Sequence, residues 1–384
     1  MLTSSSAQLF YFDEDTTYLD HGGYGATPRE VMSAYIEECQ KVEEAPRPFF
    51  EFDFYNTWQQ HAAMVAQRFS AQAEDLALTN NATDGLNAVL RSTPLQSDDE
   101  ILITSWTYGA IANAARYMAR RQGARVIEAP FHYPNPNPEQ CLEALKAAIT
   151  PRTKIAIVDH ITSATALVLP IEKMVQLCHE YNVAVLVDGA HVPGQLSLDL
   201  QTIHADWYVA NLHKWYFVPR GCGFLWAGKQ RQIELVPSVL SWDIEKPFPH
   251  SFEWIGTRDP STWLSIPAAF NFMDHLGENN VRQHNHTLIK EGAALLAKAW
   301  HISSTTPASM TGSMILVPLP ADINFPATDE GRRKLQMLLW NSYKIACPCI
   351  LYGNKLYIRI SAQIYNKAAD YEKLAQAISA IKKA

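Results

Sequence analysis

A lysine stands among apolar and aromatic residues near the middle of the 384-residue chain, in the run Ala-Asn-Leu-His-Lys-Trp-Tyr over residues 210–216. Lysine is rarely buried without a partner, and burial lowers its pKa, which makes the amine a better nucleophile or base. Lys214 is therefore a candidate for covalent or acid–base chemistry. The alternative is a lysine that lays its stem along an apolar surface and keeps its amine in water. This run alone leaves both open, so the rest of the chain must decide.

Polar residues also follow several predicted strands, at the point where each strand ends. Strand 183–187 runs directly into Asp188, and a buried carboxylate there needs a cationic or hydrogen-bonding partner. Strand 76–78 leads into a turn that opens a helix near Thr83, and backbone N–H groups at a helix start can bind an anion. Helix capping or a structural ion pair would explain the same residues without a ligand. Because ligands of open α/β sheets bind beyond the carboxyl ends of the strands, we expect these groups to meet at one edge.

Aromatic residues reach the same edge, because strand 101–104 leads to Trp106 and Tyr108. A flat ring there can cover one face of a ligand. An anion site, a carboxylate, an aromatic ring and a lysine together match a phosphorylated aromatic ring that carries a basic nitrogen and an aldehyde. The sequence therefore predicts pyridoxal phosphate, which needs a lysine Schiff base and an acidic partner for its ring nitrogen.

Alternating helices and strands must hold these residues in place. From about residue 55 helical patterns alternate with short apolar runs, and continuous apolar runs are typical of strands buried on both faces. We therefore predict an α/β fold with a mostly parallel sheet covered by helices. The predicted strands are 76–79, 100–104, 125–128, 154–159, 183–187, 207–210 and 223–226, and the predicted helices are 56–73, 84–91, 111–122, 138–148 and 171–181.

Beyond about residue 245 the pattern changes, and several prolines precede two long helical segments. A smaller set of strands and helices follows, which predicts a second, α+β unit. Its predicted helices are 265–276, 281–299, 330–341 and 370–382, and its predicted strands are 314–317 and 356–361. The predicted division is an N-terminal segment that packs on the small domain, a large cofactor-binding domain and a small C-terminal domain, with the bounds 1–20, 21–250 and 251–384.

Composition and charge limit the partners of the protein. The net charge of −7 is spread along the chain, which argues against nucleic acid or anionic lipid as a partner. The sequence contains no run of 18 apolar residues, so we predict no membrane span. The N-terminus lacks the features of a signal peptide. The six cysteines are scattered without CxxC spacing, as expected for reduced thiols. We expect a cytoplasmic protein that acts on a small molecule.

Five motifs taken together resemble class V aminotransferase-type enzymes. Within them, the sequence is most similar to the branch that holds isopenicillin N epimerases, relatives of cysteine desulfurases and selenocysteine lyases, and hercynylcysteine sulfoxide lyases. The resemblance runs from about Tyr18 to Asn366 and implies the pyridoxal-phosphate-dependent transferase fold (fold type I) and a homodimer. The motifs are Tyr18–Gly25, Asn81–Thr83, Val187–His191, His213–Trp215 and Gly256–Asp259.

The resemblance implies a role for each residue of the site. Lys214 would bind the cofactor aldehyde and then exchange the proton of the substrate α-carbon, while Asp188 would keep the pyridine nitrogen protonated. Tyr108 lies where the family stacks an aromatic ring on the cofactor. Arg359 matches the arginine that binds the substrate carboxylate, with a surface strand arginine as the alternative. The other implied contacts are Ala82, Thr83, Asn211 and His213 for the phosphate, Thr257 from the partner subunit, Ser163 and His191 beside the ring, and His21 and Tyr24 for the amino-acid substrate.

One departure from the desulfurases bears on the reaction. Desulfurases carry a mobile loop with a catalytic cysteine some way before the carboxylate-binding arginine, whereas Cys347 and Cys349 stand close to Arg359 in an apolar, strand-like run. Such cysteines usually behave as small buried hydrophobes. We therefore predict proton abstraction at the α-carbon of an amino acid. C–S cleavage of a cysteine conjugate by β-elimination, or an epimerisation like that of isopenicillin N epimerase, would follow.

Other classes stay open on the sequence. The same cofactor site would serve a class V aminotransferase, or a cysteine desulfurase or selenocysteine lyase. A Rossmann-type nucleotide enzyme shares the alternating pattern, but no GxGxxG follows the first strand and the glycines at 22–25 precede the sheet. A non-catalytic protein can use the same fold, although the presence of Lys214 and Asp188 argues against it. The histidines of the 283–286 run lie in a polar helix without nearby carboxylates or thiols, so we predict surface histidines and no metal site.

Overall fold

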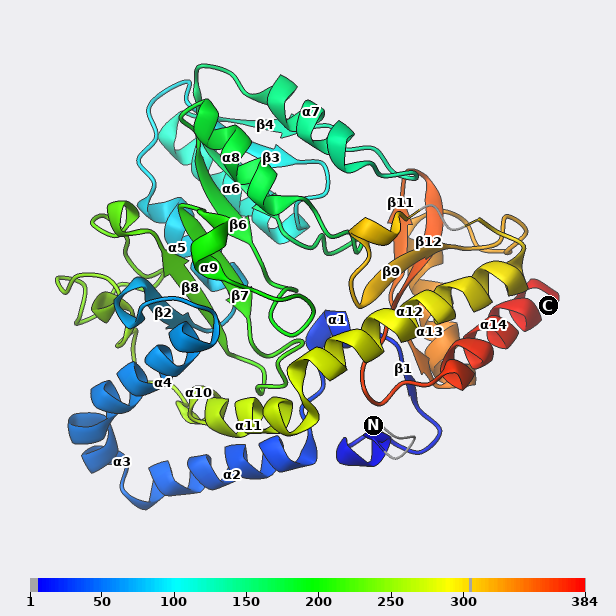
Figure 1. The fold of residues 1–384 in the computed structure, drawn as a ribbon, viewed down its shortest axis with the longest axis horizontal. Coiled ribbons are helices and arrows are strands. Elements are labelled where there is room, and N and C mark those ends of the chain that lie inside the picture. Colours follow the sequence, from blue (N-terminus) through cyan, green and yellow to red (C-terminus); the bar gives the residue numbers. More distant parts are fainter. Residues whose placement is uncertain (1–5, 304–305, 384) are drawn as a thin grey trace.

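The computed structural model describes residues 6–303 and 306–383, which form a large and a small unit side by side (Figure 1). A seven-stranded sheet forms the centre of the large unit. Its strands are β2 (Leu76–Thr79), β3 (Glu100–Thr104), β4 (Arg125–Ala129), β5 (Thr153–Asp159), β6 (Ala184–Asp188), β7 (Trp207–Asn211) and β8 (Gly223–Ala227). Their order is β2-β8-β7-β6-β5-β3-β4, and only β8 runs antiparallel to its two neighbours. The prediction of a mostly parallel sheet is confirmed.

Helices pack around this sheet, as expected for strands that are apolar on both faces (Figure 1). They are α5 (Ala82–Ser92), α6 (Gly109–Gln122), α7 (Pro138–Ala148), α8 (Ile171–Glu180) and the short α9 (Leu200–Ile203). The predicted strands and helices of this part appear at or near their expected positions. The helix predicted to reach residue 73 ends earlier, at Arg68, because Ser70 adopts a left-handed conformation (φ 58°) that does not continue an α-helix.

The register of three neighbouring strands brings polar residues together at one edge of the sheet. Asp159 at the end of β5 lies opposite Asp188 at the end of β6, and Asn211 ends the adjacent β7. All three side chains are buried. The edge therefore carries two carboxyl groups and an amide before any loop residue is added.

Several helices precede the sheet, and the sequence analysis did not predict most of them. They are α1 (His21–Tyr24), α2 (Arg29–Glu44), α3 (Pro46–Pro48) and α4 (Phe54–Arg68), of which only α4 was expected, with a π-helical stretch over Phe49–Asp53. The longest of the unexpected helices, α2, buries only Val31 and Val42. So narrow an apolar stripe gives a weak helical pattern. Short 3-10 helices lie at Ser6–Leu9, Ala73–Asp75, Lys229–Arg231, His250–Phe252 and Ala308–Met310.

The small unit is a three-stranded antiparallel sheet covered by helices (Figure 1). Its strands are β9 (Met314–Pro318), β11 (Cys349–Tyr352) and β12 (Lys355–Ser361), in the order β11-β12-β9. Its helices are α13 (Asp329–Tyr343), α14 (Ala368–Lys383) and the long α12 (Glu278–Trp300). A separate two-stranded parallel pair joins β1 (Thr17–Tyr18) to β10 (Ile345–Ala346), so the N-terminal segment is attached to this unit.

Two hydrophobic cores divide the chain differently from the predicted boundary at residue 250. The first core contains the sheet of the large unit and continues through α10 (Ser261–Leu264) and α11 (Ile266–Leu276) to Val281, and it also takes in Met310, Met314, Ile364 and Tyr365. The second core holds Leu19 and then residues from Leu288 onward. Residues 251–281 therefore pack with the large unit, and α12 crosses from one core to the other. Among the described residues, no helix is both long and apolar enough to cross a membrane.

Candidate active site

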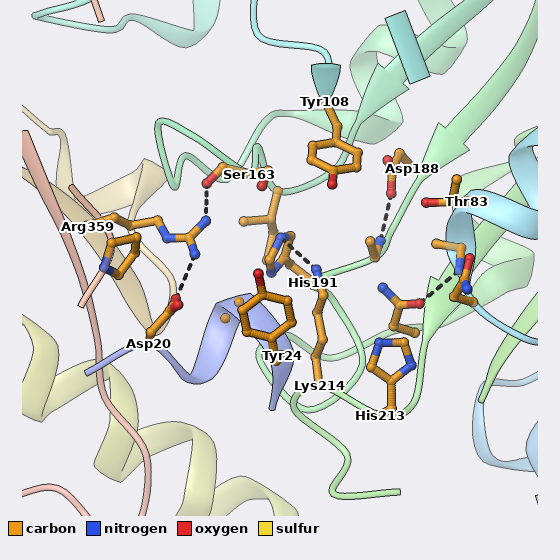
Figure 2. A pocket seen from close by; sticks show the side chains of 18 of the residues that line it. Asp20, Tyr24, Thr83, Tyr108, Ser163, Asp188, His191, His213, Lys214 and Arg359 are labelled. Carbon is orange, nitrogen blue, oxygen red and sulfur yellow. Dashed lines mark hydrogen bonds and ion pairs between the residues drawn. The ribbon is translucent and has the colours of Figure 1, made fainter. Parts of the chain in front are cut away.

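A cavity of about 520 Å³ opens at the carboxyl ends of the parallel strands, where the small unit meets the large one. It collects most of the residues that the sequence analysis selected. Figure 2 shows Arg359 and Thr83 at opposite ends of this cavity, with Lys214 between them. The predicted residues that line it are Tyr24, Ala82, Thr83, Tyr108, Ser163, Asp188, His191, Asn211, His213, Lys214 and Arg359.

Lys214 lies in the loop after β7, and its amine projects into the cavity (Figure 2). Burial lowers the pKa of Lys214 to about 8, and the positive charge of Arg359 acts in the same direction, while Asp188 and Asp20 oppose it. The amine is thus far easier to deprotonate than that of a lysine in water. The lowered pKa suits a nucleophile or a base at neutral pH.

His191 is the nearest hydrogen-bonding neighbour of that amine, with 3.2 Å between Nε2 and Lys214 Nζ. On the other side of the ring, the indole N–H of Trp215 donates a long hydrogen bond of 3.5 Å to Nδ1. Burial, together with the charges of Lys214 and Arg359, holds the pKa of His191 well below its usual range, so the ring is neutral. The neutral ring and the amine of Lys214 therefore share a hydrogen bond without a second positive charge beside the lysine.

Two carboxyl groups lie side by side at the edge of the sheet. Asp188 Oδ1 accepts the backbone N–H of Ala190 at 2.9 Å, whereas Asp159 Oδ2 has no hydrogen-bond partner among the described residues. Burial raises the pKa of both groups, and the negative charge of Asp188 raises that of Asp159 further. Asp159 therefore holds the proton and Asp188 the charge, which leaves one buried anion for a basic nitrogen. Sequence reasoning placed Asp159 at a strand end but gave it no role, because only the register reveals its neighbour.

The start of α5 forms the opposite end of the cavity. Asn81 caps this helix by accepting the N–H of Asp84, and the N–H of Ala82 donates to Asn211 Oδ1 at 2.8 Å. Two of the predicted phosphate ligands, Ala82 and Asn211, are thus hydrogen-bonded to each other, and Thr83 is a half-buried donor of the turn that lines the cavity. Arg258 adds a positive charge nearby, with Nη1 at 3.0 Å from Asn80 Oδ1. A helix start of this length beside a guanidinium favours an anion.

The guanidinium of Arg359 is buried at the other end of the cavity (Figure 2). Its Nη1 donates to the backbone oxygen of Ser163 at 2.6 Å, and its Nη2 lies 2.9 Å from Asp20 Oδ1. Burial raises the pKa of Asp20, although the charge and hydrogen bond of Arg359 oppose that shift. The alternative of a surface arginine is excluded, and a carboxylate of the chain itself occupies one side of the guanidinium. Sequence reasoning missed Asp20, because its partner is 339 positions away.

Two predicted site residues do not line the cavity. His21 is completely buried behind it, where Nδ1 lies 2.9 Å from the hydroxyl of Tyr365 and burial lowers its pKa to about 3. The prediction that His21 contacts the substrate therefore needs correction, because the turn after β1 points this ring into the protein. Thr257 is exposed and lies outside the cavity of its own chain. Arg220 and Arg332 line the cavity without having been predicted.

The histidines predicted to lie on the surface are partly buried instead. Burial lowers the pKa of both His284 and His286, and His286 Nε2 lies 2.9 Å from the backbone oxygen of Gln195. This contact joins α12 to the large unit. Among the residues described by the structure, no group of three or more His, Cys, Asp or Glu side chains is arranged to hold a metal ion.

The donor groups fit pyridoxal phosphate in type and in order along the cavity. An anion site with a nearby arginine suits the phosphate, the charged Asp188 suits a protonated ring nitrogen, and the exposed ring of Tyr108 at the cavity edge suits the face of an aromatic ring. The amine of Lys214 suits the aldehyde, and Arg359 lies beyond it, where a substrate carboxylate would bind.

Removing the charge of Asp20 should strengthen binding of a carboxylate. Asp20→Asn keeps the side-chain volume but leaves the charge of Arg359 without its internal partner. Titration of the cofactor-loaded protein with glycine, followed by cofactor absorbance, should show about tenfold tighter binding, which corresponds to ~1.4 kcal/mol. Asp274→Asn is the matched control, because Asp274 pairs with Arg68 at the surface. Unchanged or weaker binding of glycine by folded Asp20→Asn would mean that Asp20 does not compete for Arg359.

Comparisons with known proteins identify the family and the fold. A relative from Oryza sativa subsp. japonica, "Putative L-cysteine desulfhydrase 1", is 28% identical and covers 97% of this chain and 84% of its own. Isopenicillin N epimerase of Amycolatopsis lactamdurans is 29% identical and covers 97% of this chain and 96% of its own. The solved structure of the cystine C–S lyase C-DES with its product cysteine persulfide covers 95% of this chain and 98% of its own, at 21% identity and a TM-score of 0.82. The shared fold confirms the prediction of fold type I.

The family model for class V aminotransferases matches residues 17–374, a span that includes the cavity, each of the five motifs and most of both cores. The chain belongs to the class V aminotransferase family.

Proposed function

We propose that the protein is a pyridoxal-phosphate-dependent C–S lyase that removes the sulfur substituent from a cysteine-type amino acid. The observation that carries the proposal is that the amine of Lys214, the charged Asp188 and the guanidinium of Arg359 line a single cavity. Relatives named as a cysteine desulfhydrase and an isopenicillin N epimerase support a reaction at the α-carbon of an amino acid.

The cofactor would be held by Lys214 at its aldehyde, by Asp188 at its ring nitrogen, by Tyr108 on its ring face and by the start of α5 at its phosphate. When bound, it supplies an acceptor for the electron pair left on the α-carbon. Neutral His191 would keep Lys214 oriented, since the two side chains are hydrogen-bonded.

Arg359 would bind the substrate carboxylate, so that the α-carbon stands beside Lys214. The neutral amine of Lys214 takes the α-proton, the Cβ–S bond breaks and its electrons leave on sulfur, which gains a proton to become a thiol. Water hydrolyses the three-carbon remainder. The balanced reaction consumes one conjugate, R–S–CH₂–CH(NH₃⁺)–COO⁻, and one water, and releases one thiol R–SH, one pyruvate and one ammonium. No oxidant or second substrate is required.

Elimination requires fewer acid–base groups in the cavity than epimerisation does. Epimerisation needs a second acid on the opposite face of the α-carbon. The sequence offers His21, Tyr24 and Tyr108 for that acid, but His21 lies outside the cavity. Tyr24 is 70% exposed and Tyr108 is 45% exposed, and neither hydroxyl has a hydrogen bond from the described side chains of the cavity that would fix it over the α-carbon. A base alone, Lys214, suffices for elimination.

Persulfide-forming desulfuration is disfavoured by the two nearby cysteines. Cys347 and Cys349 are both buried, and burial raises the pKa of Cys349 to about 12 and that of Cys347 well above its usual range. Their thiols are therefore protonated at neutral pH, whereas attack on sulfur needs a thiolate.

Lys214 should carry the cofactor. Borohydride reduction of the loaded protein and peptide mapping should find the pyridoxyl group on Lys214, and Lys214→Ala should lower kcat by at least ~10²–10⁴. Because burial lowers the pKa of Lys214 to about 8, capture of pyridoxal phosphate by apoprotein should accelerate with pH up to about 8 and then level off. Lys229→Ala, at an exposed lysine, should change neither result. A label on another lysine would contradict the assignment.

Both cysteines should be dispensable for turnover. The Cys347→Ala, Cys349→Ala double variant should release pyruvate from S-methyl-L-cysteine at a rate within about threefold of the parent, since neither thiol is ionised. Thermal unfolding would show whether the small cavities left in the second core destabilise the protein. Loss of turnover in a folded, cofactor-loaded double variant would revive the desulfurase interpretation.

The protein is also proposed to act as a homodimer in which Thr257 completes the partner's phosphate site. In support, Arg258 lies beside the β2–α5 turn of its own chain. Gly256, which precedes Thr257, has φ 108° and open space around its Cα. The side chain of Thr257 itself is exposed. A loop of this kind can reach a second copy related by a twofold axis.

Subunit exchange tests this arrangement. Lys214→Ala and Thr257→Ala, each weakly active or inactive alone, should recover about a quarter of parental activity when mixed, because half of the dimers become hybrids with one intact site. Size-exclusion chromatography with light scattering gives the oligomeric state of each sample. A fully active monomer, or no recovery after proven exchange, would refute the shared site.

A further inference from the structure

A second cavity, of about 590 Å³, adjoins the one that holds Lys214. The two share four wall residues: Asp20, Tyr24, Arg332 and Gln336. None of these four residues is buried, so the two spaces are separated by partly or fully exposed side chains and not by the packed core. Only residues of the N-terminal turn, α13 and the β10 region form its walls.

The solvent-facing side of α13 supplies the apolar part of the second cavity. This helix buries Leu335 and Leu339 in the second core, which is the usual role of apolar residues on an amphipathic helix. Met337 and Trp340, on another face, are nevertheless 62% and 44% exposed. A thioether and an indole exposed together at a cavity wall provide an adaptable, flat surface for an apolar group. The core of the small unit does not need them, so their position points to a ligand.

Positive charge lines the same space. Arg333 stands one turn before Met337 and two turns before Trp340, and no described residue forms an ion pair with it. Arg332 contacts Asp329 at 3.3 Å and donates to the backbone oxygen of Cys349, also at 3.3 Å. The carboxylate of Asp20 does not pair with Arg332 or Arg333, because Asp20 is already bound to Arg359. The cavity therefore has an apolar wall and a cationic rim.

We propose that this second cavity is the subsite for the sulfur substituent of the substrate, and that the substituent is an aromatic or other apolar group that ends in a carboxylate. The inference rests on the proposed C–S lyase function, because Arg359 and Lys214 fix the amino-acid end of the substrate. The Cβ–S bond then directs the substituent toward the residues that both cavities share. The aromatic part would lie on Trp340 and Met337, and the terminal anion would face Arg333.

Binding measurements test the subsite without requiring turnover. Calorimetry on the cofactor-loaded Lys214→Ala protein compares S-(4-carboxybenzyl)-L-cysteine with S-methyl-L-cysteine. We expect the first to bind about tenfold or more tightly, because its ring and carboxylate find partners that the methyl group lacks. Trp340→Ala and Arg333→Gln should each reduce this ratio about three- to tenfold. Lys334→Gln is the matched control, because the neighbouring Lys334 pairs with Glu330 on the exposed surface and should leave the ratio unchanged.

Three outcomes overturn the subsite: equal affinity for the two compounds, a ratio that Trp340→Ala and Arg333→Gln do not change, or an equal effect of Lys334→Gln. Pyruvate release by the parent protein is scored separately. A large affinity ratio without pyruvate release would refute the proposed lyase function and keep the subsite. Pyruvate release at equal rates from both compounds, with equal affinity, would keep the lyase and refute the subsite.

Discussion

Charge balance in a partly closed cavity governs this site. Among the charged side chains that line this cavity, Lys214 and Arg359 face the same space as Asp20 and Asp188. Burial disfavours every one of these charges, and the arrangement decides which survive. Asp20 forms an ion pair with Arg359. Asp159, beside Asp188, keeps its proton, so Asp188 stays anionic. The pKa of Lys214 is lowered, so its amine loses its proton more easily than a lysine in water. Burial is the main cause of the lowered pKa of Lys214, the charge of Arg359 adds to it, and the charges of Asp188 and Asp20 oppose it.

The two units contribute different charged side chains to the cavity. Parallel strands of the large unit carry Asp188 and lead to Lys214, because their register fixes the carboxyl ends at one edge. The small unit supplies Arg359 from β12, and the N-terminal segment supplies Asp20 after pairing with β10. Helix α12 belongs to both cores and ties the halves together. A site built this way is rigid along the sheet and depends on the packing between units at its substrate end.

Sequence reasoning was most successful where a residue's role follows from its own strand. Lys214, Asp188 and Thr83 were predictable because each follows an apolar run at the sheet edge, and the resemblance supplied Arg359. Asp159 and Asp20 could not be assigned, since their roles depend on a strand register and on a partner at the far end of the chain. His21 was misplaced for a related reason: the sequence puts it in the right turn but does not say which way the turn faces. Helix α2 was missed because so few of its side chains are buried.

The parallel pairing of β1 with β10 has a consequence for how the protein is made. Thr17 pairs with Ile345, and Asp20 meets Arg359 across 339 positions of sequence. A ribosome must therefore complete nearly all of the polypeptide before the N-terminal segment can find its place. Until then Leu19 lacks the second core that buries it. Contacts of such long separation slow the final step of folding and leave the nascent protein dependent on protection from aggregation for that interval.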